Sequence, residues 1–163
     1  MPSLYVGTYH KYNSGSIAGN WLDLEDYADP EDFYKACKEL HSNESDPEFM
    51  FQDYEDLPAS LYSESGGIAE IYTFLDLDEH ERKIVEAYLS QETGDDFDAI
   101  LAAYQGTYDS EEDYAIEYCD NTGILSDIPD FIAYHIDYKS MGRDLTADMT
   151  SIEYDGAIWF YAF

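Results

Sequence analysis

Residues 104–123 read YQGTYDSEEDYAIEYCDNTG and contain the start and stop signals of one helix. Ser110 is the expected N-cap, and Asp113 three residues later completes a capping-box pattern. Gly123 is the expected C-terminal stop, because glycine readily takes the left-handed conformation found there. At 3.6 residues per turn, one face is assigned to the core. That face holds Tyr114, Ala115, Tyr118 and Cys119.

The opposite face of this predicted helix carries charge of one sign. Asp113, Glu117 and Asp120 stand at positions i, i+4 and i+7 with no cation between them. Each such pair destabilises a helix by roughly 0.2–0.5 kcal/mol. The stripe belongs to a longer run, residues 84–138, which contains fourteen Asp or Glu and no Lys or Arg. Because this charge weakens its own helix, we expect it to serve a purpose outside the fold.

The whole chain is strongly acidic. Its 163 residues carry 37 Asp or Glu against 7 Lys or Arg, which gives a formal net charge of −30. Two like charges about 6 Å apart in water repel by roughly 0.7 kcal/mol before screening, so the charge opposes folding. It excludes nucleic acid and anionic membrane as partners and favours a cationic partner. A hydrophobic content of 45% and an aromatic content of 17% nevertheless predict a packed core.

The cysteines and the N-terminus indicate the compartment. Cys37 and Cys119 are too few for a disulfide framework, and both fall on apolar helical faces. The N-terminus has no basic region followed by a long apolar one, and the longest apolar stretch, residues 157–163, is too short to span a bilayer. The sequence therefore predicts a soluble cytoplasmic protein.

We expect an α+β fold of three small subdomains arranged as an elongated chain. Residues 1–60 should form a small antiparallel sheet with one helix, residues 61–103 a helical middle domain, and residues 104–163 an α+β domain with a β-hairpin. Thirty charges correspond to about 50 Å of duplex DNA, whereas a compact globule of this length is about 40 Å across. If the carboxylates copy DNA phosphates, the monomer should be elongated and a symmetric dimer should imitate roughly 30 base pairs.

Local signals place the individual elements. Strands are expected over residues 4–9, 16–22 and 48–54, a turn at 13–15, and helices over residues 30–40, 68–75, from 78, 95–103, 127–134 and 138–148. Asp29 should cap the first of these helices ahead of Pro30. Residues 150–163 should form a hairpin around Asp155-Gly156, a typical type I′ turn.

Motifs that carry chemistry are lacking. The sequence has no phosphate loop and no GxGxxG, HExxH or CxxC motif. Asp76, Asp78 and His80 resemble the start of a calcium loop, but Glu81 stands where the turn needs glycine. Because Cys119 falls on an apolar helical face, we expect its thiol to be buried and not reactive. We therefore predict no catalytic residue, metal ligand or cofactor. Two alternatives stay open: a divalent-metal-binding acidic protein or hydrolase, and a salt-adapted acidic protein without a DNA-binding target.

A series of short motifs runs along the whole chain. The most specific are Tyr104-Gln105-Gly106, Tyr108-Asp109-Ser110 and Asp113-Tyr114. The others, in chain order, are Leu4-Tyr5-Val6, Tyr12-Asn13 with Gly15, Gly19 with Trp21-Leu22-Asp23, Asp53-Tyr54-Glu55, Tyr134, Ile136-Asp137-Tyr138, Arg143-Asp144-Leu145 and Asp155-Gly156. In this order they resemble the ArdA family of antirestriction proteins, which mobile genetic elements carry. The resemblance is weakest between about residues 60 and 103.

The resemblance implies a homodimeric DNA mimic without enzymatic activity. Such proteins occupy the DNA-binding groove in the methyltransferase core of type I restriction-modification enzymes and block restriction, often modification too. The resemblance also implies three small domains in a curved row, with the dimer contact in the C-terminal domain. Ile116, an apolar residue on the acidic side of the predicted helix, is the expected contact residue.

On this hypothesis, exposed carboxylates act as phosphate surrogates and share the binding energy. The expected partner-binding residues are Asp29, Glu31, Asp32, Asp95, Asp96, Asp98, Asp109, Glu111, Glu112, Asp113, Glu117 and Asp120. Tyr104 and Tyr108 are expected to present aromatic area at the rim of this acidic surface, where binding energy is often found.

Overall fold

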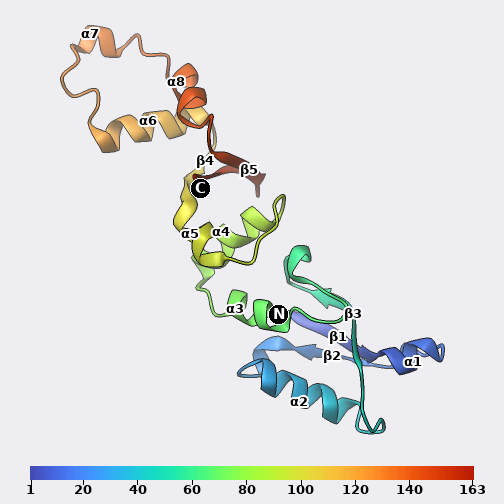
Figure 1. Cartoon of the computed structure of the whole chain (residues 1–163). Helices are drawn as coiled ribbons and strands as arrows, with labels where there is room; N and C mark the ends of the chain where they lie inside the picture. Colours follow the sequence, from blue (N-terminus) through green and yellow to red (C-terminus); the bar gives the residue numbers. More distant parts are fainter. The chain divides into compact units, whose positions relative to one another are not determined.

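The computed structural model describes residues 1–163 and confirms the α+β class (Figure 1). Helices accompany two three-stranded antiparallel sheets. The chain divides into two compact units, Met1–Arg82 and Lys83–Phe163. Helix α4 (Glu79–Leu89) contains the division between them. The expected three-part division at residues 60 and 103 stays a prediction.

The first unit is built on the sheet β2-β1-β3. Its central strand β1 (Ser3–Thr8) pairs antiparallel with β2 (Asn20–Asp23) and β3 (Phe49–Glu55). Between β1 and β2 lies a short helix, α1 (Tyr9–Asn13), which was not expected from the sequence. It forms because the Thr8 side chain accepts a hydrogen bond from the Lys11 backbone N–H at 3.2 Å.

The second strand is shorter than expected. A strand over residues 16–22 was expected, but β2 begins at Asn20. Asn20 is paired with Val6 of β1, and no residue before Asn20 is paired with β1. The β-branched Ile17 suggested a strand, yet its side chain is 73% exposed and belongs to the connecting loop. Propensity alone could not show that no neighbouring strand reaches it.

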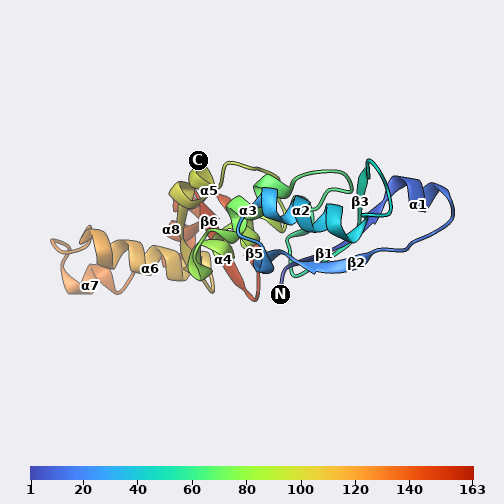
Figure 2. The ribbon, with the colours of Figure 1, turned by 90° about the horizontal axis from the view of Figure 1, so that it is seen from below.

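Helix α2 (Pro30–Leu40) lies along one face of this sheet (Figure 2). Asp29 caps it as expected, accepting the Asp32 backbone N–H at 2.9 Å. Its apolar stripe is buried against β3, since the rings of Phe33 and Phe51 lie 6.1 Å apart. A 3₁₀ turn η1 (Leu24–Asp26) comes before α2, and a second, η2 (Ala59–Leu61), follows β3.

Helix α3 (Ile68–Leu75) completes the core of the first unit. It begins and ends at the expected residues. Its buried Tyr72 donates a hydrogen bond to the backbone carbonyl of Leu24 at 2.9 Å, which satisfies the phenol inside the core.

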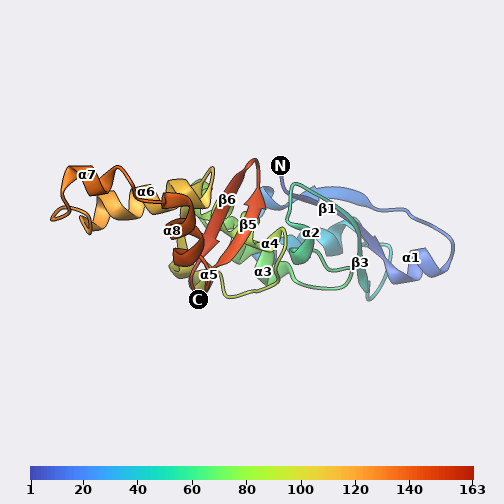
Figure 3. The same cartoon turned by 90° about the horizontal axis from the view of Figure 1, so that it is seen from above.

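The second unit is built on the sheet β4-β6-β5. Strand β5 (Thr150–Tyr154) and strand β6 (Ala157–Tyr161) form the expected hairpin, seen side by side in Figure 3. Asp155 and Gly156 both have positive φ, 51° and 80°, as a type I′ turn requires. Strand β4 (Tyr104–Tyr108) was not expected, because its partner β6 lies about fifty residues later in the sequence.

The helices of the second unit agree with the expected positions. They are α4, α5 (Phe97–Ala103), α6 (Glu111–Thr122), α7 (Asp130–Ala133) and α8 (Tyr138–Leu145). Helices α5, α7 and α8 are shorter than the expected 95–103, 127–134 and 138–148. Tyr161 links sheet to helix, since its buried hydroxyl donates to the Ile84 carbonyl at 2.7 Å.

The first unit also buries an imidazole. His41 is 1% exposed, and its Nε2 lies 3.1 Å from the Val6 carbonyl. Because a carbonyl only accepts, Nε2 carries the proton, and Nδ1 accepts from Lys11 Nζ at 2.6 Å. Glu44 accepts from the Thr8 hydroxyl at 2.9 Å and lies 3.4 Å from Lys11 Nζ. The network holds α1 and the loop after α2 against the sheet.

Burial lowers the pKa of His41. The hydrogen bond to the Val6 carbonyl and the Glu44 carboxylate oppose this effect, and the Lys11 ammonium adds to it. The unfolded chain therefore binds this proton more readily, and the stabilisation by neutral His41 is lost as pH falls below about 6.5. We expect wild type to lose about 1 kcal/mol relative to His41→Gln between pH 7.5 and 5.5. Urea unfolding of both proteins at both pH values measures this difference in the free energy of unfolding. The titration of the carboxylates cancels, because both proteins contain the same carboxylates. A difference that stays constant would contradict the assignment.

Candidate functional site: an acidic surface on the second unit

Helix α6 has the expected capping. Ser110 Oγ accepts the Asp113 backbone N–H at 3.1 Å, and its hydroxyl donates to the Asp113 carboxylate. Gly123 ends the helix in the left-handed conformation, with φ of 63°. Tyr114, Ala115 and Cys119 are buried as predicted, whereas Tyr118 is half-buried.

The outer face of α6 is a row of exposed, unpaired carboxylates. Asp113, Glu117 and Asp120 are exposed, as are the neighbouring Asp109 and Glu112. No carboxylate of α6 makes an ion pair with a lysine, arginine or histidine. Each charge is therefore available to a cationic partner. We call these five residues the α6 acidic row.

Glu111 behaves differently from the rest of the predicted set. It is half-buried, and its carboxylate accepts a hydrogen bond from the Thr146 hydroxyl at 3.3 Å. Its backbone carbonyl faces Gly142 of α8, where an added Cβ would lie 2.1 Å from the oxygen. Glu111 thus serves the packing of α6 against α8, which the spacing of charges could not reveal.

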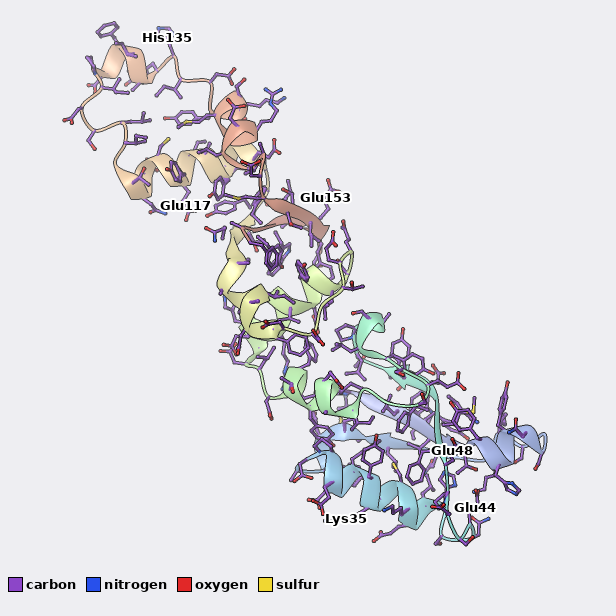
Figure 4. All side chains as sticks on the ribbon, in the orientation of Figure 1. Lys35, Glu44, Glu48, Glu117, His135 and Glu153 are labelled. Carbon is purple, nitrogen blue, oxygen red and sulfur yellow. The ribbon has the colours of Figure 1, made fainter.

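The β5–β6 hairpin adds carboxylates that the sequence reasoning missed. A shallow hollow at the turn is lined by Asp109, Glu153 and Asp155. All three are exposed, and Figure 4 shows Glu153 on the hairpin and Glu117 on α6. The strand alternation of β5, which buries Ile152, could have identified Glu153 as outward-facing.

Asp95, Asp96 and Asp98 stand exposed at the start of α5. Asp96 is its N-cap and accepts the Ala99 backbone N–H at 3.0 Å. Removing the Asp96 carboxylate would therefore disturb the helix as well as the charge.

The predicted carboxylates of the first unit are partly neutralised within the chain. Lys35 lies on α2 (Figure 4). Its Nζ is 2.9 Å from Asp32 and 3.3 Å from Glu31. Hydrogen bonds to Asp32 and then Glu31 raise the pKa of Lys35. Asp29 is used as an N-cap. Lys35 follows Asp32 by three positions and Glu31 by four, a spacing in the sequence that predicts these ion pairs.

Apolar side chains are exposed on α6 and on the segment that follows it. Ile116, the expected dimer contact, is 38% exposed. Larger exposed side chains follow on the segment that contains α7: Ile124, Phe131, Ile132 and Tyr134. Phe131 is 70% and Tyr134 86% exposed. These four residues lie within residues 124–134, and exposed apolar residues grouped in this way mark interaction surfaces. No periodic pattern in this segment of the sequence distinguishes these residues from core residues.

The two tyrosines expected at the rim are largely structural. The rings of Tyr104 and Tyr108 are half-buried and pack on Trp159 at 5.8 Å and on Tyr114 at 5.2 Å. Gly106 between them has φ of 135° at a β-bulge, where a Cβ would lie 2.6 Å from the Tyr108 ring. The glycine of the Tyr104-Gln105-Gly106 motif is thus explained by the bulge.

No three His, Cys, Asp or Glu side chains are grouped so that they could hold a metal ion. None of the helices combines the length and the apolar character needed to cross a bilayer.

The fold and surface define an acidic α+β protein whose unpaired carboxylates lie together on a helix and a hairpin. Comparison with known families agrees with that class and makes it specific. A sequence model of the family described as Antirestriction protein (ArdA) matches residues 4–159, and the chain belongs to this family. No curated protein sequence is significantly similar to the chain.

The packing at Gly142 holds the α6 acidic row in place and can be tested. We expect Gly142→Ala to lower the free energy of unfolding by about 1–3 kcal/mol, because the methyl group overlaps the Glu111 carbonyl. Gly66→Ala is the matched control, since a Cβ there meets nothing within 4 Å. Urea denaturation of both variants measures the effect. Equal stability of the two would show that α6 and α8 do not pack as described.

Proposed function

We propose that this protein inhibits type I restriction-modification enzymes by occupying the DNA-binding groove of their methyltransferase core. The observation that carries the proposal is the α6 acidic row, which stays exposed and unpaired in a member of an antirestriction family. Restriction is blocked because the groove cannot hold both this protein and DNA, and modification is blocked where the same groove serves both. The site of action is the cytoplasm.

The density of charge along the α6 acidic row is lower than that of duplex DNA, so mimicry of DNA needs more than one element. Asp113 to Asp120 spans about 10 Å of helix axis, at 1.5 Å per residue. A DNA duplex of that length carries about six charges. The row supplies three over this span, and Asp109, Glu153 and Asp155 extend the same acidic character onto the hairpin. Helix and hairpin are therefore both expected to contact the partner.

The proposed action is stoichiometric binding and not catalysis. The carboxylates act as charges, and the proposal needs neither a nucleophile nor a cofactor. Their attraction to long cationic side chains at an exposed interface is weak for each pair. Affinity therefore comes from the number of carboxylates engaged, and no single one is indispensable.

The test is displacement of DNA from a purified type I methyltransferase core. We expect the triple variant Asp109→Asn, Glu112→Gln and Asp120→Asn to bind about tenfold more weakly, at about 0.5 kcal/mol for each exposed pair lost. These side chains cap no helix, so the fold should be retained. The matched control is Glu39→Gln, Asp46→Asn and Glu48→Gln, which changes the net charge equally on exposed residues. Equal loss in both triples, or no displacement by wild type, would contradict the proposal.

We also propose a homodimer that covers the apolar surface around α7. Ile116, Ile124, Phe131, Ile132 and Tyr134 are exposed within one unit, and covering them with a second copy removes apolar area from water. The symmetric pair would double the length of acidic surface presented to the groove.

Sedimentation measures this assembly. We expect wild type to sediment at twice the chain mass of 18.7 kDa and Phe131→Asp to sediment as a monomer, because a charge placed in an apolar contact remains unpaired. Tyr12→Asp is the control, since Tyr12 is equally an exposed aromatic but lies on the first unit. A monomeric wild type would refute the dimer, and a dimeric Phe131→Asp would place its contact elsewhere.

A further inference from the structure

The face of the first sheet that points away from α2 carries a row of three side chains on three strands. Tyr5 in β1 stands opposite Trp21 in β2 and opposite Asp53 in β3. Residues opposite each other in antiparallel strands point to the same face with their Cβ atoms close together. The neighbours of Tyr5 along β1, Leu4 and Val6, are buried on the other face, where the core lies.

The aromatic part of this row is ordered and accessible. The rings of Tyr5 and Trp21 meet edge to face, with centroids 5.5 Å apart and planes at 75°. The Tyr5 hydroxyl donates to the Ile17 carbonyl at 3.1 Å, which fixes the ring. Trp21 is 37% exposed, so part of its indole surface faces solvent.

The acidic part of the row is unpaired. Asp53 is exposed, and one of its oxygens accepts the Tyr54 backbone N–H at 2.9 Å, which leaves the other oxygen without a hydrogen-bond donor from the protein. No lysine or arginine makes an ion pair with Asp53. The adjacent row adds Asp23 and Glu55 on either side of Ser3. Carboxylates thus border the aromatic pair.

We propose that this row binds an arginine side chain of the basic partner protein. A guanidinium is planar and weakly hydrated, so it stacks on an aromatic ring while donating hydrogen bonds to a carboxylate beside it. A lysine ammonium is compact and strongly hydrated and gains less from the rings. The excess of negative charge on the chain selects a cationic occupant. Tyr5 lies between the exposed indole of Trp21 and the carboxylate of Asp53, and this aromatic pair in line with a carboxylate selects arginine among cations.

The inference rests on the proposed function for the source of the arginine, namely a basic protein groove. It adds a contact of a different kind. The α6 acidic row attracts any cation through charge, whereas this site discriminates through the aromatic face. Cross-strand packing explains why Tyr5 and Trp21 touch, but it does not explain the unpaired carboxylate aligned with them.

Peptide binding followed by NMR tests the site without the restriction enzyme. The chain has two tryptophans, Trp21 and Trp159, and each gives one indole N–H signal. The probes are hexa-arginine and hexa-lysine at equal ionic strength. We expect hexa-arginine to shift the Trp21 signal at lower concentration than hexa-lysine does. The Trp159 indole should move little, because it donates to the Tyr154 carbonyl at 3.1 Å inside the second unit.

Two variants separate the aromatic and acidic contributions. Trp21→Leu, followed by isothermal titration calorimetry, should weaken hexa-arginine binding about two- to fivefold and leave hexa-lysine binding nearly unchanged. Asp53→Asn, followed through the Trp21 signal, should weaken both peptides, but hexa-arginine more. Asp46→Asn is the matched control, an exposed carboxylate in a loop, and should leave the preference for arginine unchanged.

The peptide experiments decide whether this arginine site exists. Equal response of the Trp21 signal to both peptides, or an arginine preference that survives Trp21→Leu in the folded protein, overturns it. An arginine preference lost in Trp21→Leu alone supports it. The assay with the methyltransferase core separates this result from the proposed function. If wild type displaces DNA and Trp21→Leu does so equally well, the arginine site is wrong; if wild type fails to displace DNA, the proposed function is wrong.

Discussion

The cost of burying an ionised carboxylate is the constraint under which both units of this protein fold. An ionised carboxylate cannot be placed in an apolar core without a partner. The buried polar side chains are Ser3, Thr8, His41 and Thr146, and no carboxylate is among them. With 37 acidic residues directed to the surface, each unit depends on a small sheet and the helices packed on it for its stability.

The few cations in the chain are distributed unevenly with respect to this charge. Lys35 pairs with two carboxylates of α2, and Lys11 supports the loop that contains Glu44. The α6 acidic row has no such partner. Since a neutralising lysine at i+4 would have stabilised α6, its absence from the row fits a helix that is completed by a partner's cations. This contrast makes α6 and the hairpin the strongest carriers of the proposed mimicry.

Much of this arrangement could be predicted from the sequence, because its signals are local. The caps of α2 and α6, the left-handed Gly123 and the Asp155-Gly156 turn each depend on neighbouring residues and were confirmed. Strand β4 and the structural use of Glu111 were missed, because both depend on contacts with residues 31 or more positions away. Helix α1 was missed for a different reason: a five-residue helix held by one cap is too short for periodicity to reveal.

Membership of the family identifies the chain as an antirestriction protein, and the structure identifies the residues on which a mechanism can be tested. The central claim is that carboxylates on α6 and the hairpin replace DNA phosphates. The most direct measurement is the dissociation constant for the methyltransferase core between about 50 and 200 mM salt, where complexes held by charge weaken strongly. The account predicts steady weakening across this range, with a smaller dependence for the triple variant that lacks three of these carboxylates. A dissociation constant that does not change with salt would contradict it.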